Sequence, residues 1–83
     1  MEEMTHLLKV AAKLAKQGEH ESAAEKFLEA VELASDDPRG WFGLGVCCAR
    51  GGKLNEAREA LEEARRLGHP RADEVLKKLL EKM

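Results

Sequence analysis

Apolar side chains recur every three or four positions along most of the chain. Leu7, Val10, Ala11 and Leu14 are the first such set, and this spacing places them on one face of a helix. The same period continues to the C-terminus and is interrupted four times. It predicts five helices, at about residues 3–17, 21–34, 38–50, 55–67 and 71–82. The loops between them are short, so consecutive helices are expected to pack antiparallel.

Glycine and proline mark the expected helix ends. Gly18 stands where a helix would close in the left-handed conformation that glycine adopts easily. Residues 51–52 (Gly-Gly) and 68–70 (Gly-His-Pro) are expected to end the third and fourth helices in the same way.

Side chains that accept hydrogen bonds mark the expected helix starts. Asp37 is suited to cap the third helix, and Pro38 to occupy its first position, where no N–H is needed. Ser22 and Glu25 have the spacing of a capping box, and Asn55 is expected to cap the fourth helix.

The second half of the chain repeats the first at a distance of 34 residues. Small residues fall on small residues, and large apolar residues fall on large ones. The matched pairs are Leu7 with Trp41, Val10 with Leu44, Ala11 with Gly45, Ala23 with Ala57, Phe27 with Leu61 and Ala30 with Ala64. A self-similarity of this period indicates stacked helical units.

These positions resemble the tetratricopeptide repeat family. The second unit reads Trp41-x₂-Leu44-Gly45-x₂-Cys48, then Ala57-x₃-Leu61, then Pro70; the first reads Leu7-x₂-Val10-Ala11-x₂-Leu14, then Ala23-x₃-Phe27. Cys48 stands where the family usually has an aromatic residue. The resemblance implies an all-α fold, a right-handed stack of antiparallel helix hairpins in one domain, residues 1–83. Repeat one would span about 4–37, repeat two about 38–70, and a capping helix about 71–83.

The last helix is expected to cover the second hairpin. Its apolar stripe is predicted to contain Leu76, Leu79, Leu80 and Met83, while Glu74, Lys77, Lys78 and Glu81 would form a polar outer side.

The resemblance also implies a binding surface. In this family the first helix of each hairpin lines a concave side that binds extended peptides or helices. The positions carried over to this chain are Thr5, Leu8, Ala12, Ala15 and Lys16, then Arg39, Phe42, Val46, Ala49 and Arg50, then Glu74, Lys77 and Glu81. The predicted partner-binding residues are Thr5, Leu8, Ala12, Lys16, Arg39, Phe42, Val46, Arg50 and Lys77.

Two interpretations of this surface stay open. Leu8, Ala12, Phe42 and Val46 could form the apolar centre of a protein-binding groove with basic edges, or Leu8 and Phe42 could pack against each other. The asparagines with which some family members hold a peptide's terminal carboxylate are missing. The leading hypothesis is therefore a protein–protein interaction module for a peptide or helix. The alternative is a minimal or engineered repeat scaffold that self-associates, as a homodimer, without a separate ligand.

Composition narrows the choice of partner and compartment. The chain is 36% charged with a formal net charge of −2, so it lacks the basic excess typical of nucleic-acid binding. No apolar run is long enough for a membrane span, and the acidic, polar first residues are unlike an export signal. Two free thiols without such a signal favour the cytoplasm.

Candidate chemistry in the sequence is sparse. Cys47 and Cys48 are adjacent, and His6, His20 and His69 stand at no metal-ligand spacing from them. No cysteine or serine is accompanied by the pattern of a nucleophilic enzyme. We therefore expect no enzyme, no metal and no cofactor, with Cys48 in the core and Cys47 against the preceding helix.

Overall fold

Five α-helices make up most of residues 2–83, the part of the chain that the computed structural model describes. They are α1 (Glu2–Lys16), α2 (His20–Leu33), α3 (Pro38–Arg50), α4 (Leu54–Arg66) and α5 (Ala72–Lys82). Every predicted helix is present, with its ends within one residue of those expected. The all-α helical stack predicted from the sequence is confirmed.

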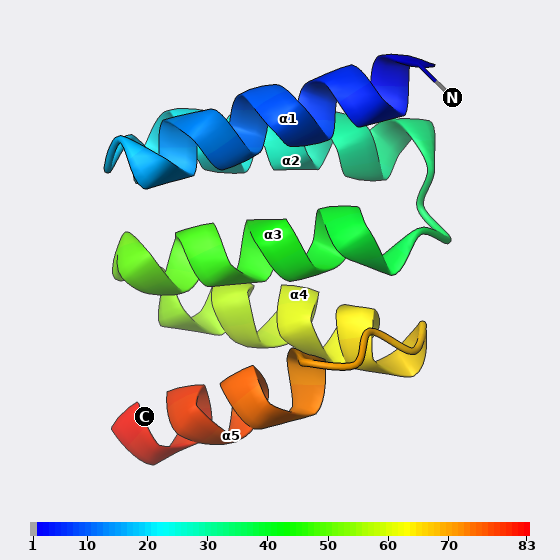
Figure 1. The fold of residues 1–83 in the computed structure, drawn as a ribbon. Coiled ribbons are helices and arrows are strands. Elements are labelled where there is room, and N and C mark those ends of the chain that lie inside the picture. The colour runs from blue at the N-terminus through cyan, green and yellow to red at the C-terminus, as the bar shows by residue number, and fades with distance from the viewer. Residues whose placement is uncertain (1) are drawn as a thin grey trace.

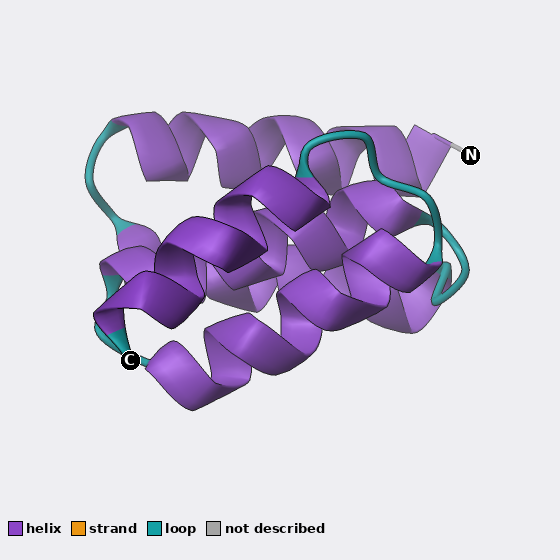
Figure 2. Cartoon of the chain, turned by 90° about the horizontal axis from the view of Figure 1, so that it is seen from below, coloured by secondary structure: helices purple, strands orange, loops and turns teal. Residues whose placement is uncertain are grey.

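The helices form two antiparallel hairpins, α1–α2 and α3–α4, and α5 packs on the second (Figure 1). α1, α3 and α5 follow one another on one side of the stack, and α2 and α4 lie on the other (Figures 1 and 2). α2 packs against both α1 and α3, and α4 packs against both α3 and α5. One side of the molecule is therefore built only from the first helix of each unit.

Three of the helices end in the same glycine turn. Gly18, after α1, has φ of +82°, and Gly52 and Gly68 have φ of +83° and +93°, a conformation that glycine adopts without steric cost. The Glu19 N–H donates to the Leu14 carbonyl at 2.9 Å, the long hydrogen bond of a Schellman motif. Equivalent bonds close α3 and α4, so the predicted helix stops are confirmed.

The start of α3 is capped as predicted. The Asp37 carboxylate accepts a hydrogen bond from the Arg39 N–H at 2.9 Å, and Pro38 occupies the first helical turn. The Trp41 indole N–H donates to the Ser35 carbonyl at 2.8 Å, which ties the helix to the turn before it.

The predicted caps of α2 and α4 are wrong. The N-cap residues are Glu19 and Lys53, neither of which forms a side-chain capping bond, and Ser22 and Asn55 lie inside the helices. The reason is the glycine turn: its last residue is already the N-cap of the next helix, since the Glu19 carbonyl accepts from the Ala23 N–H. No position remains between turn and helix for a separate cap.

The core consists of two clusters, one on each side of α3. One joins α1, α2 and α3, and the other joins α3, α4 and α5. The buried members are Ala11, Ala23, Phe27 and Cys47 in the first, and Cys48, Ala57, Leu61, Leu76 and Leu79 in the second. The two cysteines thus face opposite clusters, and both lie where the sequence predicted.

Glycines on α3 allow its neighbours to approach closely. A Cβ atom built on Gly45 would lie 2.6 Å from Cγ of Leu61, and one built on Gly43 would collide with the Phe27 ring. Both large side chains are buried. The repeat pattern pointed to Gly45, whereas nothing in it pointed to Gly43.

The predicted apolar stripe of α5 is only half correct. Leu76 and Leu79 are 2% and 4% exposed, but Leu80 and Met83 are 48% and 54% exposed. Leu80 and Met83 stand 35 residues after Gly45 and Cys48, against which α4 packs. No helix follows α5 in the described chain, so these two side chains have nothing to cover them, and the outer side of α5 is not purely polar.

Candidate functional site

A shallow apolar groove of about 380 Å³ runs between α1 and α3. Aliphatic and aromatic side chains make up most of its lining. The lining residues are Leu8, Ala12, Ala15, Phe27, Arg39, Phe42, Gly43, Val46, Cys47 and His69. Arg39 is the one permanent cation among them, and its guanidinium is held by Asp37, with Nη2 to Oδ2 at 2.7 Å.

A second groove, of about 310 Å³, runs between α3 and α5. Its apolar part includes Phe42 and Val46, which also line the apolar groove, so the two are continuous across α3. Cationic side chains surround it. The full lining is Phe42, Val46, Ala49, Arg50, Leu54, Arg71, Val75, Lys78, Leu79 and Lys82. We call it the basic groove.

The structure brings together most, but not all, of the predicted partner-binding residues. Leu8, Ala12, Arg39, Phe42 and Val46 line the apolar groove, and Arg50 lines the basic groove.

Three predicted partner-binding residues lie elsewhere. Thr5 lies towards the start of α1 beside His6 and Lys9, and Lys16 is exposed on the last turn of α1. Lys77 is 75% exposed and pairs with Asp73, Nζ to Oδ2 at 3.6 Å, so it lines neither groove.

Phe42 is partly buried by contacts with other residues of the fold. Its ring packs against the second core cluster and stacks on the His69 ring, with centroids 3.9 Å apart and planes 7° from parallel. The Arg71 guanidinium lies 5.8 Å from the Phe42 centroid. Leu8 likewise packs against the first cluster. Both residues therefore contribute to the fold as well as to the groove.

Burial and the neighbouring Arg71 cation lower the pKa of His69 below its ordinary value of 6.5. The geometry agrees, because His69 Nδ1 accepts a hydrogen bond from the Arg71 N–H at 3.1 Å and so cannot carry a proton there. Both features favour the neutral form of His69 in the folded protein.

The stability of the protein should depend on pH through this histidine. The unfolded chain binds a proton at His69 more readily than the folded chain, so the free energy of unfolding should fall as pH drops below about 6.5. His69→Gln should flatten this part of the profile. Urea denaturation between pH 7.5 and 5 measures this, and identical profiles for His69→Gln and the parent chain would contradict the assignment.

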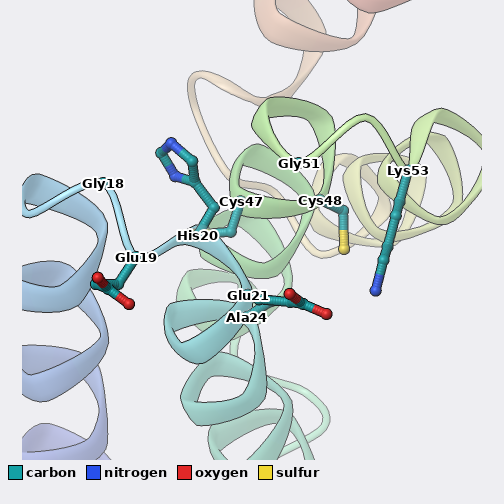
Figure 3. A pocket seen from close by; sticks show the side chains of 9 residues that line it. All are labelled: Gly18, Glu19, His20, Glu21, Ala24, Cys47, Cys48, Gly51 and Lys53. Atoms are coloured by element: carbon teal, nitrogen blue, oxygen red, sulfur yellow. The ribbon is translucent and has the colours of Figure 1, made fainter.

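A third hollow lies between the turn that follows α1 and the one that follows α3. Figure 3 shows Glu21, from the start of α2, and Lys53, from the turn after α3, around it together with Cys48. Burial raises the pKa of both thiols, Cys47 and Cys48, so they stay protonated and are weak nucleophiles. Nδ1 of His20 is buried there without a hydrogen-bond partner.

Residues 2–83 contain neither a cluster of metal ligands nor a helix that could span a membrane. No three His, Cys, Asp or Glu side chains in this range are grouped closely enough to hold a metal ion. No helix in it combines the length and apolar character needed to cross a bilayer.

Sequence reasoning missed several groove residues. His69, Arg71, Lys78 and Lys82 all line a groove, but none was predicted. Lys78 follows Lys77 by one residue, and one residue turns a helix by about 100°. The position of His69 over Phe42 depends on the path of the loop between α4 and α5, for which helical periodicity gives no signal.

Comparison with known proteins gave one family and one solved structure of note. The family model described as tetratricopeptide repeat matches residues 11–75. The solved structure is the type III secretion translocator chaperone SycD of Yersinia enterocolitica, in an alternative dimer, with a TM-score of 0.93 and 24% sequence identity. The match covers 99% of this chain and 64% of SycD, so the chain spans about two thirds of that protein. A comparison with curated protein sequences gave no match.

Proposed function

Because the chain belongs to the tetratricopeptide repeat family, we propose that it binds a segment of another protein, as a peptide or a helix, along the apolar groove between α1 and α3. A small stack of helices that presents such a groove is suited to hold a partner without catalysing a reaction. The chaperone SycD, whose fold it shares, lends support to this kind of role.

The observation that carries the proposal is the continuity of apolar surface across two helices. Ala12 on α1 is exposed, and Val46 on α3 is partly exposed, yet both line one groove with Leu8 and Phe42. Apolar groups at the centre of a surface, with charged groups at its edge, are typical of protein-binding sites.

Binding is better supported than catalysis. The thiols of Cys47 and Cys48 are buried and unbridged, and their raised pKa values make them poor nucleophiles. Free thiols also support a reducing compartment such as the cytoplasm.

The test uses Ala12→Glu, a change that the fold should tolerate because Ala12 is exposed in the middle of α1. A carboxylate placed in the groove must lose water when an apolar partner binds. Peptides selected from a random display library on the parent chain should bind the variant roughly tenfold more weakly, or worse. Fluorescence polarisation of labelled peptides measures the affinity.

The matched control is Asn55→Glu, which makes the same change of charge at an exposed site on α4, outside both grooves. We expect it to leave affinity unchanged. Equal affinity of Ala12→Glu and Asn55→Glu for every selected peptide would refute the proposal.

Self-association is the second candidate, and the exposed side chains of Leu80 and Met83 favour it. They leave an apolar stripe on the outer side of α5, which a second copy of the chain could cover. Light scattering across a range of concentrations distinguishes the two: self-association gives a mass that rises with concentration and returns to the monomer in Leu80→Gln.

A further inference from the structure

We propose that the basic groove between α3 and α5 selects partners in which acidic residues lie next to an apolar stretch, the apolar part occupying the groove between α1 and α3. This inference rests on the proposed function, because it concerns the second half of the same binding surface. To the proposed function it adds the chemical character of the partner, which is acidic beside an apolar stretch.

The first observation is the segregation of charge. The chain as a whole carries 14 Lys and Arg against 16 Asp and Glu. The basic groove nevertheless has four cationic residues in its lining, Arg50, Arg71, Lys78 and Lys82, and no Asp or Glu. A partner with neutral or basic residues at this place would gain nothing from these charges.

The second observation is that these four cations form no ion pair with a carboxylate of residues 2–83. Elsewhere on the surface, ion pairs such as Arg39 with Asp37 and Arg66 with Glu63 are formed within the chain. In residues 2–83, none of the four cations around the basic groove has a carboxylate within ion-pair distance. All four are exposed, and Arg71 also lies over the Phe42 ring, 5.8 Å from its centroid. Each can pair with acidic groups supplied from outside.

The third observation is that the lining changes from apolar in one groove to cationic in the next. On the α1 side of Phe42 and Val46, the lining is apolar and its one permanent cation, Arg39, is already paired. On the α5 side, the same two residues adjoin the unpaired cations. An extended segment that crosses α3 therefore contacts apolar surface on one side and positive charge on the other, which selects a ligand with an apolar part next to an acidic part.

A protein segment fits these features better than a nucleic acid. The floor of the basic groove is aliphatic, with Val46, Ala49, Leu54 and Val75, and it offers bases little beyond the partly covered face of Phe42. The net charge of −2 also repels a long polyanion that extends beyond the groove.

The probes are three synthetic peptides with the same leucine-rich stretch, followed by glutamates, glutamines or lysines. The glutamate peptide should bind the parent chain at least roughly tenfold more tightly than the glutamine peptide at low salt, and the difference should shrink as salt is added. The lysine peptide should bind weakest. Fluorescence polarisation gives all three affinities.

The decisive variant is Lys78→Gln with Lys82→Gln. It removes two of the four cations at exposed positions, so the fold should be retained, as circular dichroism will show. The glutamate peptide should lose roughly tenfold in affinity, from two exposed charge pairs, and the glutamine peptide should lose nothing. Lys9→Gln with Lys13→Gln, on exposed parts of α1 outside both grooves, makes the same change of net charge and should alter neither.

The outcomes separate this inference from the proposed function. If the glutamate and glutamine peptides bind equally and Ala12→Glu weakens both, the preference for acidic partners is wrong while the apolar groove still binds. If neither binds, or Ala12→Glu has no effect, the proposed function fails and this inference with it.

Two rival occupants would also overturn it. Oligouridine that binds through Lys78 and Lys82 as tightly as the glutamate peptide would point to nucleic acid. Self-association that disappears in the double lysine variant would point to a second copy of the chain, docking through an acidic region such as that of Glu3, Glu29 and Glu32.

Discussion

Gly45→Val should destabilise the protein by about 3 kcal/mol, at the upper end of what overpacking usually costs. A Cβ on Gly45 would lie 2.6 Å from Cγ of Leu61 and 3.2 Å from its backbone nitrogen. Leu61 is fully buried and cannot swing into solvent, so α4 itself must move away from α3. The better helix propensity of valine returns less than about 1 kcal/mol.

Gly51→Val is the control for this prediction. A Cβ there meets nothing closer than 3.4 Å, the residue is exposed and its φ of −84° suits any L-amino acid. We expect a change of about 0.5 kcal/mol or less. Urea denaturation compares the two, and equal losses of stability would mean that α3 and α4 are not packed through Gly45.

Phe42→Ala should cost about 2–3 kcal/mol of stability, somewhat less than the loss of a fully buried phenylalanine. The ring packs on the second core cluster and stacks on His69, and such an aromatic pair adds about 1 kcal/mol. Removal of the ring also uncovers His69, so the pKa of His69 should rise towards 6.5. Chemical denaturation and an NMR titration of the imidazole measure the two effects.

Leu28→Ala is the comparison for this change. Leu28 is 47% exposed on α2, and its truncation should cost less than about 1 kcal/mol and leave His69 unaffected. A Phe42→Ala protein as stable as Leu28→Ala would show that Phe42 belongs to the surface alone, which is the first of the two interpretations that the sequence left open. Because Phe42 serves both fold and groove, its substitution cannot isolate binding, and Ala12 is the sounder site for that test.

The repeat made the fold predictable from the sequence. Gly18 and Gly52 stand 34 residues apart, and each closes a helix through bonds within its own turn. Helix ends set by such local geometry can be found in a single sequence. The caps assigned to Ser22 and Asn55 failed because residue preference was considered without the turn that precedes them.

The candidate site was less predictable, for reasons of geometry. Leu8, Ala12 and Val46 could be placed on a groove because the resemblance fixes their helical faces. Lys77 was chosen in place of Lys78, since nothing in the sequence fixes the rotation of α5 against α3. His69 covers Phe42 through the path of a loop, which has no period from which it could be predicted.

Phe42 is a wall common to both grooves, so a ligand that displaced its ring would link the two. A ligand that moves the ring on one side changes the shape of the other side. The two occupancies must then influence each other by the same factor in both directions. Protonation of His69, which stacks on that ring, enters the same balance, so acidity, apolar contact and charge recognition would be coupled through a single side chain.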